Sequence, residues 1–170
     1  MKYWAVAAVV ALASFLMPAP SWSKGPISKI TVQPLGIGRT VEISDKETLG
    51  NFAIWSGPGV GGWDMVTTIP RPGEAAFIID WTRGQLRDGP NALTRYQVVM
   101  QVEEYAPPCN KYEVIYGVSE AGEGYVYLPN WDETPGRCNS SLIYRGVEGN
   151  WFHSSPKWDQ IVMPLLRTDR

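Results

Sequence analysis

Apolar and polar residues alternate most regularly over residues 96–102 and 111–118, and this pattern predicts two long β-strands. A period of two places every second side chain on one face, so each stretch has one buried face and one wetter face. The apolar positions are Tyr96, Val98, Met100, Val102, Tyr112, Val114, Tyr116 and Val118. Short connections before and after the second stretch predict an antiparallel meander, which short strands at 124–128 and 141–145 extend.

The first half of the chain contains shorter stretches of the same kind. Residues 30–33 and 41–43 alternate apolar and polar side chains on either side of a Gly36-Ile37-Gly38 turn, which predicts two short strands. Residues 75–82 are rich in apolar and aromatic side chains and predict a third. Between these strands, Ser44 and Glu47 fit a capping box and predict a helix of about two turns.

A second helix is predicted at the C-terminus. Ser155 followed by Pro156 is typical of an N-cap and a first helical position. A buried stripe at helical spacing follows, consisting of Trp158, Ile161, Val162 and Leu165. Pro164 is expected to end or kink the helix near residues 160–163. The pattern therefore predicts a single α+β domain, mainly an antiparallel β-sheet (a meander) with two short helices.

The N-terminal residues have the pattern of a targeting segment. Lys2 precedes an apolar run from Trp4 to Met17, and small residues at positions 21 and 23 suit a signal peptidase. The alternative is a membrane anchor, but the run is shorter than the roughly 20 residues that span a bilayer. We expect residues 1–23 to be a signal peptide and residues 24–170 to form the domain, secreted or periplasmic, with no membrane span after cleavage.

The predicted export bears on the oxidation state of the two cysteines. In an oxidising compartment an even count predicts one disulfide, Cys109–Cys138. The meander supports this pairing, because the two cysteines fall in connections at the same end of the sheet. The alternative, two free or metal-binding thiols, lacks a CxxC pair or nearby histidines.

Charge and motifs restrict the function. The chain has 15 Lys and Arg against 17 Asp and Glu, so no basic stripe predicts a nucleic-acid partner. Residues 57–62 match GxGxxG, but no strand is predicted before them and no helix after them. His153 is the only histidine and no GxSxG elbow is present, which disfavours a serine triad. These patterns favour a protein without enzymatic activity and predict no cofactor and no metal site.

Loop aromatics and charges point to binding. The connection after residue 128 contains the predicted contact residues Trp131, Asp132, Glu133 and Arg137, and Tyr105 lies in the loop that shares its end of the sheet. Trp63 is a further loop aromatic. Such side chains stack on sugar rings or anchor a protein partner.

The sequence thus predicts an extracytoplasmic binding or interaction module for an unknown protein or carbohydrate ligand. One alternative is a hydrolase of cell-wall or extracellular polymer that uses loop carboxylates such as Asp132 and Glu133. The other is a structural component of the cell envelope.

Several short N-terminal motifs resemble the opening of an uncharacterised group of small bacterial exported proteins. They are Ile30-Thr31-Val32, Val41-Glu42-Ile43-Ser44-Asp45, Phe52 and Trp55-Ser56-Gly57-Pro58-Gly59. The resemblance implies a bacterial origin and carries no activity with it.

Overall fold

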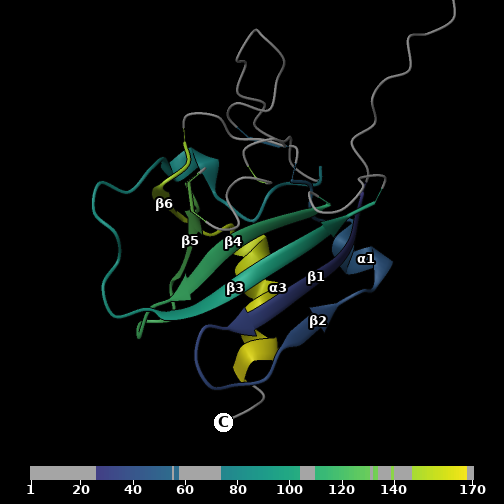
Figure 1. Cartoon of the computed structure of the whole chain (residues 1–170), viewed down its shortest axis with the longest axis horizontal. Coiled ribbons are helices and arrows are strands. Elements are labelled where there is room, and N and C mark those ends of the chain that lie inside the picture. The colour runs from purple at the N-terminus through teal and green to yellow at the C-terminus, as the bar shows by residue number, and fades with distance from the viewer. Residues whose placement is uncertain are drawn as a thin grey trace, which may run out of the picture.

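The computed structural model describes residues 26–54, 56–57, 74–103, 110–130, 132–133, 139 and 147–167. Among these residues, one antiparallel sheet of six strands runs in the order β2-β1-β3-β4-β5-β6 (Figure 1). The strands are β1 (Ile27–Pro34), β2 (Val41–Ile43), β3 (Thr94–Val102), β4 (Lys111–Val118), β5 (Gly124–Leu128) and β6 (Asn150–His153). The run from β3 to β5 confirms the predicted meander over these three strands, whereas β6 was not predicted, and the β1–β2 hairpin extends the sheet beyond β3.

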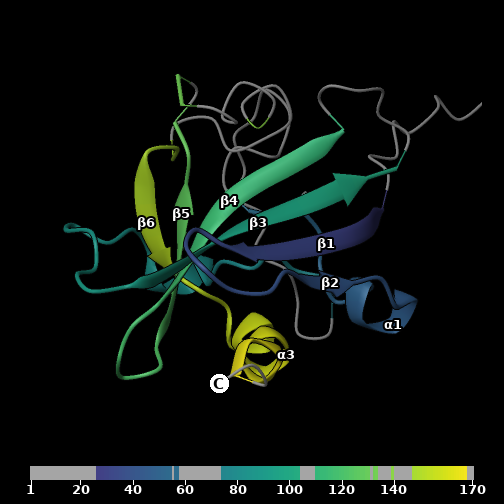
Figure 2. The same cartoon turned by 60° about the horizontal axis from the view of Figure 1, so that its bottom comes forward.

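One face of the sheet is covered by helix α3 (Pro156–Arg167), which lies below the sheet in Figure 2. Alternation along β3 and β4 points Val98, Met100, Tyr112 and Val114 toward this side, where all four are buried. We call this side the covered face. The arrangement confirms an α+β fold that is mainly antiparallel sheet.

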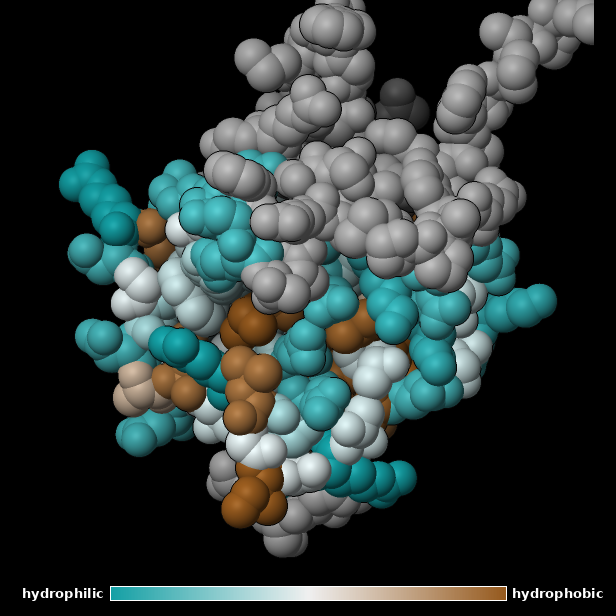
Figure 3. Space-filling model, viewed as in Figure 1, coloured by the Kyte–Doolittle hydropathy of each residue, from teal (hydrophilic) through white to brown (hydrophobic). Residues whose placement is uncertain are grey.

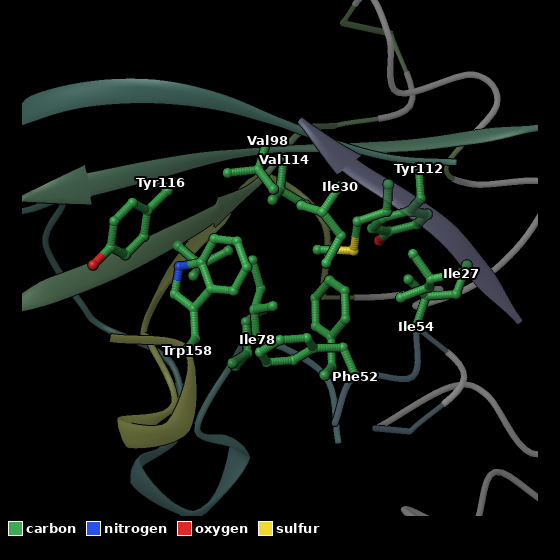
Figure 4. Close-up of a cluster of buried hydrophobic side chains, with 14 of the residues drawn as sticks. Ile27, Ile30, Phe52, Ile54, Ile78, Val98, Tyr112, Val114, Tyr116 and Trp158 are labelled. Carbon is green, nitrogen blue, oxygen red and sulfur yellow. The ribbon is translucent and has the colours of Figure 1, made fainter. Parts of the chain in front are cut away.

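Trp158 of α3 is fully buried in the core, as the helical stripe predicted, and lies near Tyr116 in Figure 4. Its ring meets those of Phe52 and Tyr116 edge-on, with centroids 5.4 and 5.8 Å away. These contacts join the helix, the segment after β2 and the middle of the sheet into one apolar cluster.

The predicted strand at 75–82 is wrong. Phe77, Ile78 and Ile79 are buried in succession, but within the described residues the segment forms only isolated bridges, Ala76 with Phe52 and Ile79 with Ser154, instead of a strand ladder. A 3₁₀ turn, η1 (Trp81–Arg83), follows, capped by the Asp80 carboxylate. The segment then runs along the outer edge of β6, where the Leu86 N–H donates to the Trp151 carbonyl at 2.9 Å. This segment therefore pairs backbone groups that β6, as an edge strand, would otherwise leave without hydrogen-bond partners.

Both helices differ from prediction in detail. Helix α1 (Lys46–Leu49) is a single turn, and Asp45 rather than Ser44 caps it by accepting from the Thr48 N–H at 2.8 Å. This bond lowers the pKa of Asp45. Helix α3 begins at Pro156 as predicted but continues through Pro164 to Arg167. Leu165, predicted in the buried stripe, is 40 % exposed, and Leu166 packs against the core instead.

Several predictions lie outside the described residues: the signal peptide at 1–23, the strand at 141–145, and both cysteines. Within the part of the chain that the structure describes, no helix is long and apolar enough to cross a membrane.

Candidate ligand-binding face

Aromatic side chains gather on the uncovered side of β5 and β6. The alternation that buries Val126 and Phe152 on the covered face turns Tyr125, Tyr127, Trp151 and His153 to the opposite side, where all are half-buried. We call this surface the aromatic face. Figures 1 and 3 view the sheet from the side opposite α3, where apolar surface occurs as separate spots among hydrophilic surface.

Strand register arranges these rings as pairs. Tyr125 lies opposite His153 and Tyr127 lies opposite Trp151. The ring centroids are 5.1 Å apart in the first pair and 5.3 Å apart in the second, and both pairs are tilted by 38°. Cross-strand aromatic pairs of this kind stabilise a sheet and limit the freedom of each ring.

Trp151 is held against the sheet by its neighbours. The Arg95 guanidinium lies 5.6 Å from the centre of its ring, a cation–π contact. A Cβ at Gly117 of β4 would stand only 3.3 Å from the Trp151 ring and 2.5 Å from the Leu93 side chain. Glycine at this position therefore leaves room for the indole to lie over β4.

Carboxylates surround the aromatic pairs. The Tyr127 hydroxyl donates to Glu133 at 2.6 Å, and the Tyr125 hydroxyl donates to Glu123 at 2.7 Å. Burial and the Glu133 contact raise the pKa of Tyr127 to about 12, so its phenol stays protonated at neutral pH. On the adjoining strands, Gln97 donates to Glu113 at 2.6 Å. The surface thus combines ring faces with hydrogen-bonding groups.

His153 contributes an imidazole that is neutral at neutral pH. Burial, together with the charge of Arg83, lowers its pKa. The neighbouring Ser154 points to the covered face, where its hydroxyl donates to the Asp159 carboxylate at 2.7 Å. Because successive strand residues face opposite sides, His153 and Ser154 do not form a nucleophile–base pair.

The structure describes two of the predicted contact residues. Asp132 and Glu133 are exposed, and Glu133 joins the aromatic face through Tyr127. Trp63, Tyr105, Trp131 and Arg137 lie outside the described residues. Within the part of the chain that is described, no group of histidine, cysteine and acidic side chains could hold a metal ion.

The sequence prediction missed the aromatic face itself. Tyr125 and Tyr127 alternate with Val126 and Leu128, which was a usable signal. The second half of the surface comes from β6, however, and that strand was not predicted.

Comparisons with protein-family models, with curated proteins and with solved structures find no match for this chain.

Proposed function

We propose that this protein is a non-enzymatic extracytoplasmic binding module whose aromatic face takes a carbohydrate ligand. The observation that carries the proposal is the pairing of Tyr127 with Trp151 in register, with both residues half-buried and Arg95 in contact with the Trp151 ring. The apolar C–H face of a sugar ring stacks on such aromatic surfaces, and rigid rings lose little conformational freedom on binding.

Hydrogen-bonding groups beside the rings support a sugar over a purely apolar ligand. Glu133 and Glu123 lie next to the tyrosine hydroxyls, and the Gln97–Glu113 pair lies on the adjoining strands. Sugar hydroxyls both donate and accept hydrogen bonds, so acceptors from carboxylates and a donor from the amide complement them.

Export is part of the proposal: residues 1–23 as a signal peptide, residues 24–170 as the mature domain, and a Cys109–Cys138 disulfide. Asn110 and Asn139, which follow the two cysteines, support the pairing. The Asn110 carbonyl accepts from the Val102 N–H at 2.9 Å, directly before β4. The Asn139 side chain accepts from the Glu113 N–H at 2.9 Å and donates to the Glu113 carbonyl. Asn110 and Asn139 thus both lie at the N-terminal half of β4.

The disulfide is tested by mass spectrometry of the exported protein before and after reduction. We expect the mass to rise by two hydrogens on reduction, and an N-terminus near Lys24. Alkylation of both cysteines without prior reduction would contradict the disulfide.

Binding is tested by co-sedimentation of the purified protein with insoluble peptidoglycan, chitin and cellulose. We expect retention on at least one of them and at least tenfold weaker binding by Trp151→Ala, the size of loss typical of a central aromatic contact. Val99→Ala, on the same side of β3, is the matched control and should bind normally.

Lack of retention on all three polymers, or full-strength binding by folded Trp151→Ala, overturns the carbohydrate proposal. Release of new reducing ends during the assay contradicts its non-enzymatic part and favours a hydrolase.

A further inference from the structure

A concave surface lies on the side of the sheet opposite the aromatic face, at the C-terminal half of α3. It is a cavity of about 520 Å³ between α3, the beginning of β3 and the β4–β5 hairpin. Its volume falls in the range of pockets that hold small organic ligands. The cavity is separate from the aromatic face, because its sheet residues point to the covered side.

Four apolar or aromatic side chains line the cavity beside the polar Thr94 and Ser119. Tyr96 and Val118 line it from the sheet, and Met163 and Leu166 line it from α3. All four side chains are half-buried, so they retain surface that a ligand can cover. An apolar group seated here would remove that surface from water.

Two opposite charges stand at the rim. Arg167 comes from the last turn of α3, and Glu120 comes from the β4–β5 hairpin. Both are exposed, and neither pairs with an opposite charge among the described residues. The Arg167 guanidinium lies beside the hairpin, with Nη2 3.6 Å from the position that a Cβ at Gly122 would occupy.

We propose that this cavity binds a zwitterionic amino acid or short peptide with an apolar side chain. The ligand carboxylate meets Arg167, whose planar guanidinium suits a carboxylate with two parallel hydrogen bonds. The ligand ammonium meets Glu120, and the apolar side chain rests on Tyr96, Val118, Met163 and Leu166. A simple fatty acid would satisfy Arg167 only and leave Glu120 without a partner, so the two rim charges favour a zwitterion.

The test is calorimetric titration of the whole exported protein with leucine and with leucyl-leucine. We expect saturable binding of at least one, and the ligand that binds more tightly shows whether the cavity prefers a single amino acid or a dipeptide. Two blocked forms of the tighter ligand, one N-acetylated and one with an amidated C-terminus, remove one charge at a time. Each block should weaken binding about tenfold, as expected for a charged hydrogen bond.

Matched variants assign each charge to its partner. Arg167→Gln should weaken binding of the free ligand about tenfold. It should leave the affinity for the amidated form unchanged, because that form has no carboxylate for Arg167 to bind. Glu120→Gln should likewise leave the N-acetylated form unchanged. Arg87→Gln and Glu103→Gln, exposed charges elsewhere on the surface, are the controls and should bind like the parent.

Two results would overturn the inference. One is no saturable binding of either ligand at millimolar concentration. The other is an equal loss in each rim variant for free and blocked ligands. Neither result bears on the aromatic face, whose test uses polysaccharides and Trp151.

Discussion

Tyr116 of β4 and Tyr127 of β5 lie on opposite sides of neighbouring strands, yet each donates its phenolic hydrogen bond to a carboxylate. Tyr116 donates to Asp159 of α3 at 2.8 Å, and Tyr127 donates to Glu133 at 2.6 Å. The Tyr116 ring is fully buried, whereas Tyr127 and Glu133 keep contact with water. Burial raises the pKa of both phenols, more strongly for Tyr116.

The same two groups, a tyrosine hydroxyl and a carboxylate, stabilise the fold on one face and are available to a ligand on the other. On the covered face the Tyr116–Asp159 bond ties α3 to the sheet, and the fully buried Tyr116 has no contact with water. On the aromatic face water competes for both groups, so the Tyr127–Glu133 bond contributes little to stability and a ligand can take its place. Substitutions on the first face should change unfolding, and those on the second should change binding.

The largest expected difference is between two tryptophans. Trp158→Ala removes a fully buried ring and should lower the free energy of unfolding by about 3–5 kcal/mol. Trp151→Ala should cost less than half as much, because Trp151 is only half-buried. Urea unfolding followed by circular dichroism measures both.

Trp158→Phe is the control for the first substitution. The indole N–H of Trp158 has no hydrogen-bond partner among the described residues, so phenylalanine leaves no polar group unpaired. It should retain most of the stability that alanine loses. Equal destabilisation by Trp151→Ala and Trp158→Ala would show that the aromatic face is core.

A smaller difference is expected between the two tyrosines. Tyr116→Phe removes a buried partner of Asp159 and should lower the free energy of unfolding by about 1–3 kcal/mol. Tyr127→Phe should change it by about 0.5 kcal/mol or less. The same unfolding assay compares them, and a larger cost for Tyr127→Phe would refute the division between the faces.

Regular alternation made the centre of the sheet predictable. Residues 124–128 form β5 as predicted, and β3 and β4 differ from prediction by at most a few residues at their ends. In these strands apolar side chains recur at every second position, and these are the side chains that the fold buries.

Prediction failed where packing overrides local pattern. In the segment at 75–82, three successive buried residues fill the space below the sheet without forming a ladder. Strand β6 has four residues and mixes polar and aromatic side chains, so its pairing with β5 could not be read from its own sequence. The aromatic face depends on that pairing, and of the two predicted contact residues that the structure describes, Glu133 joins it through Tyr127.

The smallest expected effects are in the titration of two aspartates. Burial raises the pKa of Asp159, whereas the hydrogen bond from the Thr48 N–H lowers that of the exposed Asp45. Asp159 therefore adds stability as pH falls through its raised folded pKa toward its ordinary value. Asp45 adds stability above its ordinary pKa and loses it as pH falls through its lowered folded value.

Carboxyl carbon chemical shifts followed by NMR against pH measure both midpoints. We expect Asp159 to titrate above the ordinary aspartate pKa and Asp45 below it. The reverse order would mean that the described burial of Asp159 or the α1 cap is incorrect.

The most direct test of the central claim is NMR titration of the isotopically labelled protein with a soluble oligosaccharide of the polymer that retains it. The account predicts that the indole N–H signal of Trp151 and the amide signals of residues 125–127 and 150–153 shift on binding. The Trp158 indole and the amides of α3 should stay in place. Shifts confined to α3 and the covered side, with the Trp151 signal unchanged, would contradict it.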